Sequence, residues 1–488
     1  MEFKTKNIKA IFPEYLCTII GLILLLFNCS ISHAQNKDKP NVILIFADDL
    51  GWGDLGSYGH NQLKTPALDK LAKEGKLFTQ FYVNSPVCSP SRASLMTGRF
   101  PAELGIHGHL STPESNSSRG MPNYLNPEIH TITKMFKDNG YAVGHFGKWH
   151  LGHSLDAPLP NAYGIDEAKT NTSNSTDNFK LWHPDNRPIA TKLILDETIN
   201  FINRNKDKPF YVNAWLVDPH AVLNPTEKQM EMYEHVSPKP YAKKYYGKEV
   251  KFHGAPQVYY ATVTEMDRQI GIFLDKLEAL GRADNTIVIF TSDNGPEVMQ
   301  ISNAAHSAAG SPGPFRGFKR SLYEGGIRVP LIVRWPKHIN ENTIDSTSVI
   351  SAVDFIPTLN SLCGFNTNIN LDLDGEDMSN SLLISPKKRI KPLFWEWRFG
   401  IVGRPIDKSP MLVMRQNQWK LLMNPDKSRI ELYDIIKDPS ELENKILDEP
   451  EIVDRMSKKL LSWKSKLPYG LEDKNAGSNS YKWPKVSN

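Results

Sequence analysis

The chain has 488 residues, of which 40% are hydrophobic and 23% are charged, a globular balance with enough material for one large core and a smaller domain. Its 58 basic and 54 acidic side chains nearly cancel, which argues against a protein drawn to nucleic acid by its overall charge. Four cysteines are too few for a fold held together by disulfides.

Residues 1–34 have the features of a signal peptide. Three lysines precede an apolar run at 16–27, and Ser32-His33-Ala34 places small residues at the two key positions of a cleavage site. The run is too short to favour a stable membrane span. Cys29 offers a lipoprotein alternative, but the residues before it fit a lipobox poorly. We therefore expect cleavage after residue 34 and a periplasmic or secreted protein.

The rest of the chain alternates short apolar runs with amphipathic stretches. This pattern predicts an α/β fold with a largely parallel sheet. The predicted strands are 41–47, 141–146, 210–217, 286–292 and 331–335. The predicted helices are 65–74, 128–139 and 258–280, each of which stops before a glycine.

Two polar insertions interrupt this pattern. We expect a turn-rich loop at 169–178. The stretch 238–253 combines five lysines with three tyrosines, which fits a solvated loop better than a segment that binds a polyanion. Beyond residue 385 the alternation fades into short strands and a helix at 449–466. We predict a catalytic α/β domain over 35–385 and a small C-terminal α+β subdomain over 386–488.

Polar groups directly follow four of the predicted strands. They are Asp48-Asp49, Lys148-Trp149-His150, Asp218-Pro219-His220 and Asp293-Asn294. Ligand sites of open α/β sheets lie beyond the carboxyl ends of the strands, so we expect these groups to meet at one edge. A single Asp pair is commonly a cap or turn. Two pairs, Asp48-Asp49 and Asp293-Asn294, instead favour a site of oxygen ligands for Ca²⁺ or Mg²⁺.

Cys88 opens the string CSPSR, and the residues from Ser91 onward resemble the first turns of a helix. The free amides of a helix N-terminus favour an anion, and Arg92 adds a planar fork for oxyanions. An unmodified thiolate could act as a nucleophile here. Cys363 lies in an apolar stretch, where a buried structural thiol is expected.

The string CSPSRASLMTGR resembles the signature of the type I, formylglycine-dependent sulfatases of the alkaline phosphatase superfamily. The segments NVILIFADDLGWGDLGSYG, GYAVGHFGKWHLG, IVIFTSDNG and RGFKRSLYEGGIRVPLIVRWP match that family in collinear order, over roughly residues 40–465. The resemblance implies a large mixed, mostly parallel sheet flanked by helices. Phe318 departs from the family pattern, as do Ala221-Val222, and these departures affect the shape of the pocket.

The resemblance also implies that a maturation enzyme oxidises Cys88 to formylglycine, whose hydrate attacks sulfur. Cys88 would then contact the metal together with Asp48, Asp49, Asp293 and Asn294. We expect Arg92, Lys148 and Lys319 to stabilise charge on the sulfuryl oxygens. We expect His220, assisted by Lys319, to protonate the leaving oxygen, and His150 to act as the base. The two histidine roles could be interchanged.

Export favours a sulfated polysaccharide or its oligosaccharides as the substrate. The aromatic segments Trp182-His183 and 395–398 could contact sugar, although packing explains them equally well. His306 and Arg316 are weaker candidates for specificity. The alternatives are a phosphonate or phosphate ester hydrolase of the same superfamily and a non-catalytic carbohydrate-binding relative. The presence of every catalytic position argues against the non-catalytic relative.

Overall fold

A computed structural model describes residues 39–479 of the protein, except 153, 155, 172–178, 237–240, 246–247, 300–305 and 366–371. For residue 171 and the hairpin strands within 241–252 it describes the backbone alone. The predicted signal peptide lies outside these residues. Within the described part of the chain, no helix is both long enough and apolar enough to span a membrane.

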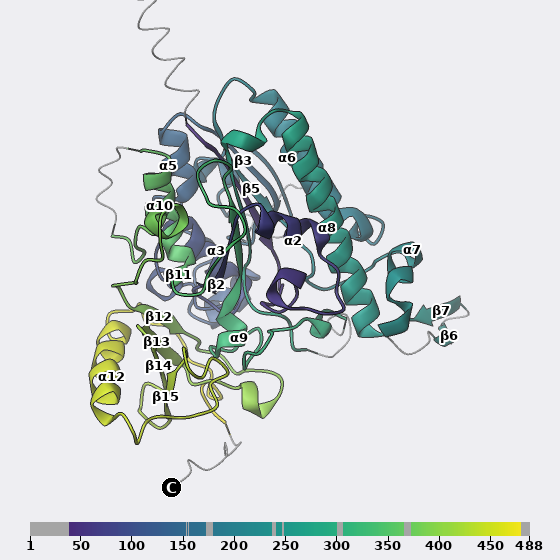
Figure 1. Ribbon diagram of the computed structural model, residues 1–488. Helices are drawn as coiled ribbons and strands as arrows, with labels where there is room; N and C mark the ends of the chain where they lie inside the picture. Colours follow the sequence, from purple (N-terminus) through teal and green to yellow (C-terminus); the bar gives the residue numbers. More distant parts are fainter. Residues whose placement is uncertain are drawn as a thin grey trace, which may run out of the picture.

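A nine-stranded mixed sheet forms the centre of the larger unit (Figure 1). The strand order is β10-β2-β9-β8-β1-β5-β3-β4, and β11 also pairs with β2. Only β9 runs antiparallel to its neighbours; all other described pairs are parallel. The strands are β1 (Asn41–Ala47), β2 (Lys76–Tyr82), β3 (Ala142–Lys148), β4 (Glu167–Asn171), β5 (Phe210–Trp215), β8 (Thr286–Ser292), β9 (Arg328–Arg334), β10 (Thr343–Asp345) and β11 (Ile350–Ser351).

Helices cover both faces of this sheet (Figure 1). On one face lie α2 (Pro66–Lys73), α6 (Ala190–Arg204) and α8 (Ala255–Ala279), and on the other α3 (Cys88–Thr97), α5 (Ile132–Asp138) and α10 (Phe355–Leu362). Strand β1 is buried along its whole length and sends alternate side chains into the two cores, as a central parallel strand must. The prediction of an α/β fold with a mostly parallel sheet is confirmed.

Several predicted boundaries were wrong for local reasons. Helix α5 begins at Ile132, not at residue 128, because the hydroxyl of Thr131 accepts a hydrogen bond from the Lys134 amide and caps the helix there. The expected loop at 169–178 begins as strand β4. The expected loop at 238–253 contains an antiparallel hairpin, β6 (Tyr241–Tyr245) and β7 (Lys248–Phe252).

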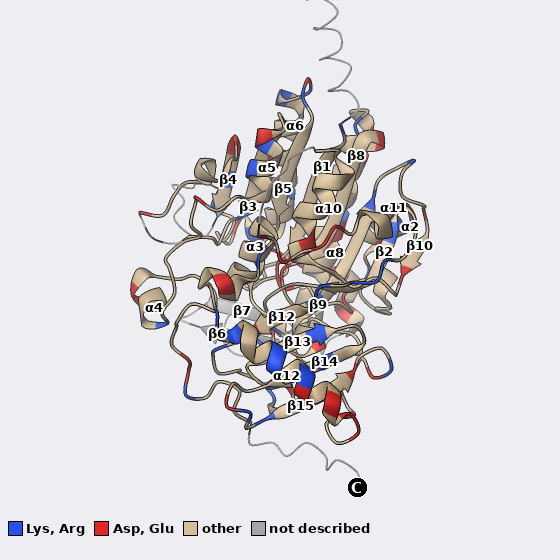
Figure 2. Cartoon of the chain, turned by 90° about the vertical axis from the view of Figure 1, so that its left-hand side faces the viewer, with Lys and Arg blue, Asp and Glu red and all other residues tan. Residues whose placement is uncertain are grey.

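The C-terminal unit is a four-stranded antiparallel sheet below the main sheet (Figures 1 and 2). It consists of β12 (Leu393–Glu396), β13 (Leu412–Gln416), β14 (Trp419–Met423) and β15 (Ile430–Asp434), covered by α12 (Pro450–Lys464). Trp395 and Trp397 are buried in its core, and the indole of Trp395 donates to the Val83 carbonyl. Trp395 therefore anchors the C-terminal unit to the main unit, and the burial of both rings supports packing, the second of the two explanations that the sequence left open. The domain boundary at residue 385 stays a prediction.

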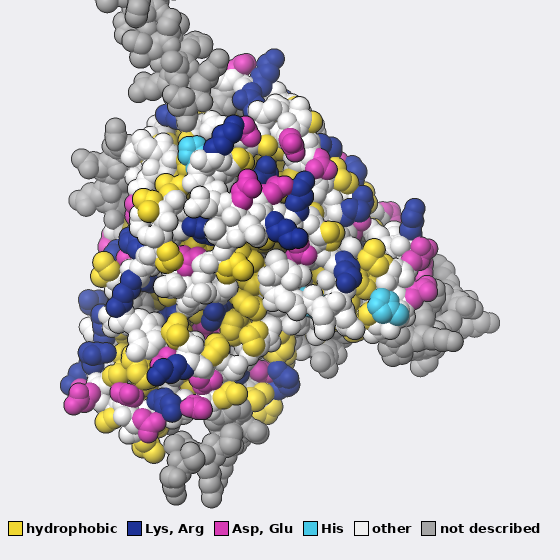
Figure 3. Space-filling model, in the orientation of Figure 1, with side chains coloured by type: hydrophobic (Ala, Val, Ile, Leu, Met, Phe, Trp, Pro, Cys, Tyr) yellow, Lys and Arg dark blue, Asp and Glu magenta, His cyan; other side chains and the backbone are white. Residues whose placement is uncertain are grey.

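The surface carries no large field of one sign on the face shown in Figure 3, where basic and acidic side chains are interspersed. This distribution matches the formal net charge of +4. Any strong attraction of a charged ligand must therefore come from local clusters of side chains.

Candidate active site

Four adjacent parallel strands, β8, β1, β5 and β3, end at one edge of the main sheet. The polar groups that follow them therefore meet there, as the sequence predicted. Asp48, Asp293 and Lys148 are buried side by side, each delivered by a different strand end. The convergence follows from parallel pairing, which brings the carboxyl ends of all four strands to the same edge.

Three buried cations each have one carboxylate as their main partner in this cluster, and Arg92 Nη2 also lies 3.8 Å from Asp48 Oδ1. Lys148 Nζ lies 2.6 Å from Asp48 Oδ2, and Lys319 Nζ lies 2.6 Å from Asp49 Oδ2. Arg92 donates to Asp293 Oδ2 through Nη2 at 2.6 Å and through Nε at 3.1 Å. Such pairing is required for buried charged groups, because the burial of an isolated ion carries a large desolvation penalty.

The pKa values of the three cluster members Asp293, Asp49 and Lys319 reflect this packing. Burial, reinforced by Asp48, raises the pKa of Asp293 to about 6. Burial also opposes ionisation of Asp49, but Lys319, His220 and Lys148 together hold its pKa below its ordinary value. The pKa of Lys319 is raised because Asp49 and Glu297 outweigh the effect of burial. The cluster therefore favours charged lysines facing charged acids.

The acids also present oxygens that suit a hard cation. Asp48 Oδ1 and Asn294 Oδ1 are buried and have no hydrogen-bond partner among the described residues. Asn294 Nδ2 donates to Asp49 Oδ1 at 2.7 Å, which leaves the amide oxygen as its free group. Unmatched buried oxygens are costly, and coordination to a cation would satisfy both. The donor set fits Ca²⁺ or Mg²⁺ held by Asp48, Asp49, Asp293 and Asn294.

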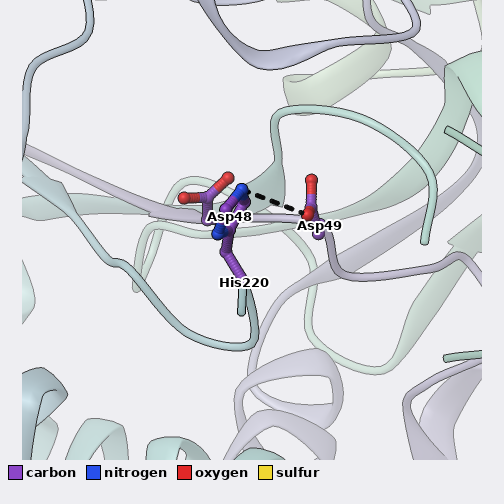
Figure 4. Close-up of side chains that lie close together, drawn as sticks. All are labelled: Asp48, Asp49 and His220. Carbon is purple, nitrogen blue, oxygen red and sulfur yellow. Dashed lines mark ion pairs between the residues drawn. The ribbon is translucent and has the colours of Figure 1, made fainter. Parts of the chain in front are cut away.

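His220 reaches the same cluster from the loop after β5 (Figure 4). Its Nε2 lies 3.7 Å from Asp49 Oδ2, and ligand atoms of Asp48, Asp49 and His220 lie within 4.8 Å of one another. Its Nδ1 lies 2.7 Å from the Ala221 carbonyl, which can only accept, so Nδ1 carries a hydrogen. Burial, despite Asp49, lowers the pKa of His220 to about 3. Its Nε2 is therefore the atom that faces the site.

His150 lies in the loop after β3, where its Nε2 is 3.1 Å from the Leu110 carbonyl and must donate to it. Its Nδ1 is buried and has no hydrogen-bond partner among the described residues. Burial, followed by Lys148 and Arg92, lowers the pKa of His150 well below its ordinary value. A neutral imidazole with a free lone pair on Nδ1 can accept a proton, which is what a general base requires.

Cys88 is the first residue of α3, and the preceding Val87 has extended backbone. Its thiol is buried within electrostatic range of Lys148 and Lys319, but also of Asp293. Burial raises the pKa of the Cys88 thiol in spite of the two lysines. The prediction that residue 88 stands at a helix N-terminus is confirmed, whereas this environment does not favour an unmodified thiolate as the nucleophile.

Three further side chains of the site were not predicted as catalytic. Glu297 is buried and holds Arg320 through both carboxylate oxygens, at 2.6 and 3.2 Å, and its Oε2 is 3.7 Å from Lys319 Nζ. The ring of Trp182 meets the ring of His220 edge-on, with centroids 5.5 Å apart. Two features of the sequence could have revealed these residues. Glu297 lies four residues after Asp293, and Arg320 directly follows Lys319.

Arg316, in contrast, has a structural role. Its guanidinium donates to the carbonyls of Ile406 and Glu441 and lies 3.7 Å from the centre of the Tyr323 ring. It ties the catalytic unit to the C-terminal unit, so its suggested role in specificity is not supported.

A buried cysteine among paired cations and carboxylates, at the carboxyl edge of an α/β sheet, is the arrangement of a hydrolase for an anionic ester. The model of the sulfatase family matches residues 40–365, and the model of the C-terminal region of N-sulphoglucosamine sulphohydrolase matches residues 313–466. The chain belongs to the sulfatase family, and it is a sulfuric ester hydrolase.

Individual relatives agree with this assignment. N-acetylgalactosamine-6-sulfatase of Sus scrofa is 32% identical over 429 residues, covering 77% of this chain and 76% of the relative. Arylsulfatase A of Homo sapiens is 32% identical over 371 residues, covering 73% of this chain and 70% of the relative.

Solved structures share the alkaline phosphatase-like fold. The structure of Ps i-CgsB in complex with k-i-k-neocarrahexaose is similar with a TM-score of 0.72 and 28% identity, covering 88% of this chain and 94% of that one. The phosphonate monoester hydrolase of Agrobacterium radiobacter has a TM-score of 0.61 and 22% identity, covering 88% of this chain and 96% of that one. That second likeness shows the fold alone.

Proposed function

We propose that the protein hydrolyses sulfate esters on carbohydrates, using a formylglycine made from Cys88 and a bound Ca²⁺. The observation that carries the proposal is the position of Cys88 at the start of α3, among three buried cations and a set of unmatched oxygens. The sugar substrate is supported by two similar proteins, one named N-acetylgalactosamine-6-sulfatase and one solved in complex with k-i-k-neocarrahexaose. Mg²⁺ is the alternative cation.

The charge balance of the site explains why a divalent cation is needed. Arg92, Lys148, Lys319 and Arg320 are matched by the four carboxylates of Asp48, Asp49, Asp293 and Glu297. The cluster by itself therefore has no excess charge with which to attract a sulfate ester. A divalent cation adds two positive charges and makes the pocket attractive to an anion.

Each protein group then has a defined task. Formylglycine, once hydrated, supplies one hydroxyl that attacks sulfur and a second whose deprotonation expels sulfate and restores the aldehyde. Arg92, Lys148 and Lys319 stabilise charge that develops on the sulfuryl oxygens. His150, through its free Nδ1, takes the proton when sulfate is expelled. The charged Lys319 donates to the departing sugar oxygen, and His220 donates through Nε2 in its doubly protonated form, which an anionic substrate favours by raising the His220 pKa.

A cavity of about 400 Å³, two of whose lining residues are sequence neighbours of site residues, offers room for the sugar. Phe318, next to Lys319, forms part of its wall, and Val298, next to Glu297, forms another part. The Arg404 guanidinium lies over the Phe318 ring, 4.9 Å from the ring centroid, and its Nε donates a hydrogen bond to Asp407 Oδ2. An aromatic face with a nearby guanidinium suits a sugar ring that carries anionic groups.

Phe318→Ala is expected to lower kcat/KM for a sulfated oligosaccharide about tenfold, mainly by raising KM, because it removes one wall of the sugar cavity. The measurement compares defined sulfated oligosaccharides with an aryl sulfate, a phosphate diester and a phosphonate monoester. Tyr469→Ala, which removes an exposed aromatic ring, is the matched control and should change nothing. A higher kcat/KM on the phosphonate ester than on every sulfated substrate would contradict the proposed function.

His220→Ala is expected to slow hydrolysis of sugar sulfates about 10²-fold more than hydrolysis of an activated aryl sulfate. A phenolate with electron-withdrawing groups leaves without protonation, whereas a sugar alkoxide does not. The rates of both substrates are compared in the variant and the parent enzyme. Equal losses of rate on the two substrates would mean that Lys319 or His150, and not His220, is the general acid.

We propose that the protein is exported after removal of residues 1–34 and is matured by an enzyme that reads the Cys88 motif. The n-region lysines, the short apolar run and the cleavage site support export. N-terminal sequencing of protein recovered from the periplasm or medium is expected to begin at Gln35. A mature chain that begins with lipid-modified Cys29 would instead support membrane anchoring.

A further inference from the structure

A second cationic cavity lies where the edge of the main sheet meets the C-terminal sheet. It has a volume of about 270 Å³, close to the lower end of the range usual for small-ligand sites. Its walls come from the segment before β11, the segment that leads into β12, and the turn between β13 and β14. None of the predicted catalytic or metal-binding residues lines it, so it is separate from the active site.

The charge of this cavity is of one sign. Among the described residues that line it, four side chains are cationic and none is acidic. The cationic residues are Lys388, Arg389, Lys391 and Arg415. On the face shown in Figure 3, by contrast, basic and acidic side chains are interspersed.

Two of these cations carry buried donors without hydrogen-bond partners among the described residues. Arg415 is 2% exposed; its Nη2 donates to Gln80 Oε1 at 2.5 Å, whereas Nε and Nη1 have no partner. Arg389 is 9% exposed; its Nη1 pairs with Asp354 Oδ2 at 2.5 Å and its Nε lies 3.8 Å from Glu376 Oε1, whereas Nη2 has no hydrogen-bond partner. Unpaired buried donors are costly, and an anionic oxygen would satisfy them.

The surroundings of Arg415 point the same way. Burial lowers the pKa of Arg415, and the neighbouring Arg328 and Arg389 lower it further, against the opposing effects of Tyr82 and Glu324. The Arg415 guanidinium also lies over the Tyr82 ring, 4.6 Å from its centroid. An anion placed between the guanidinium groups of Arg389 and Arg415 would oppose this effect of burial.

The rim adds groups that suit a sugar. Three consecutive amide side chains, Gln416, Asn417 and Gln418, line the cavity at the β13–β14 turn. Ile390 and Ile436 also line it and are 77% and 56% exposed. Amides donate to and accept from hydroxyl groups, and aliphatic side chains can cover the C–H face of a sugar ring.

We propose that this cavity is a second, non-catalytic binding site for a sulfated carbohydrate. A sulfate group sits against Arg389 and Arg415, and the sugar ring contacts the amide turn. Bound there, a polysaccharide chain is retained on the enzyme between turnovers at the active site, which raises its local concentration. The inference does not depend on the proposed catalytic mechanism, because it uses none of those residues.

The experiment measures binding of a carrageenan hexasaccharide to the Cys88→Ala protein by isothermal titration calorimetry, so that turnover does not interfere. Two sites per chain are expected. Lys388→Glu, made in that background, is expected to weaken one of them about tenfold or more and leave the other unchanged. Arg415→Gln should also weaken that site, provided that the variant protein folds. Because Lys388 is exposed, Lys388→Glu should fold and therefore tests the proposal even if Arg415→Gln does not fold.

Controls separate charge from structure. Lys206→Glu, which reverses one exposed charge in the turn before β5, should leave both sites unchanged. The desulfated hexasaccharide and inorganic sulfate should each bind the second site more weakly than the sulfated sugar, since each supplies only half of the contacts. If the active site does not take this sugar, one site remains and Lys388→Glu removes it. Hexasaccharide binding that Lys388→Glu leaves intact would overturn the proposal.

Discussion

Cys88→Ala is expected to fold normally and to lose sulfate ester hydrolysis by about 10⁴-fold or more, because the nucleophile is removed while the surrounding charges stay paired. The buried Cys88 thiol has a raised pKa and no means of expelling sulfate after attack, whereas a hydrated aldehyde has a second hydroxyl for that step. The measurement is kcat/KM on an aryl sulfate, with circular dichroism to verify the fold.

The matched control is Cys363→Ala, which truncates the other cysteine of the catalytic unit, also buried and at the end of α10. It should lose some stability but keep its activity within about twofold, because it lies in the apolar core. Mass spectrometry of the peptide that contains residue 88 should show the aldehyde or its hydrate. Fully active enzyme that contains only unmodified Cys88 would contradict the mechanism.

Asp48→Asn is expected to weaken divalent-cation binding about 10²-fold or more and to reduce activity in parallel. The substitution removes one negative charge from the ligand set and leaves Lys148, 2.6 Å from Asp48, without its counter-ion. The parent protein should contain one Ca²⁺ or Mg²⁺ per chain by elemental analysis. Chelation should lower both its activity and its melting temperature, and at about 100 times Kd the ion contributes about 2.7 kcal/mol of stability.

The control for this experiment is Asp166→Asn, which breaks an exposed ion pair with Lys137 far from the ligand set. It should keep its metal content and its activity, because exposed ion pairs contribute little. Asp293→Ala would likewise leave a buried cation, Arg92, without its main partner, so its effect on stability has to be measured together with its effect on metal binding. One zinc per chain, with neither calcium nor magnesium, would contradict the assignment of a hard-cation site.

Some elements were easy to predict and others were not, for identifiable reasons. Strands β1 and β8 were predicted to the residue because both are continuous apolar runs that end at acidic residues. Strand β2 was missed because Lys76 and Gln80 interrupt its apolar pattern, although both are buried. Lys76 donates to the carbonyls of Ser381 and Leu382, about 300 positions away, and no local pattern reveals such partners.

The sequence by itself determined the family, the mostly parallel sheet and the residues that gather at its edge. These properties depend on local periodicity and on short motifs around Cys88 and the two acidic pairs, which are present in the linear chain. Only the tertiary structure decided which cation pairs with which carboxylate, which oxygens of Asp48 and Asn294 lack a hydrogen-bond partner, and that Glu297 holds Arg320. Buried charges and donors are satisfied by partners from distant segments, so their pairing exists only in the folded protein.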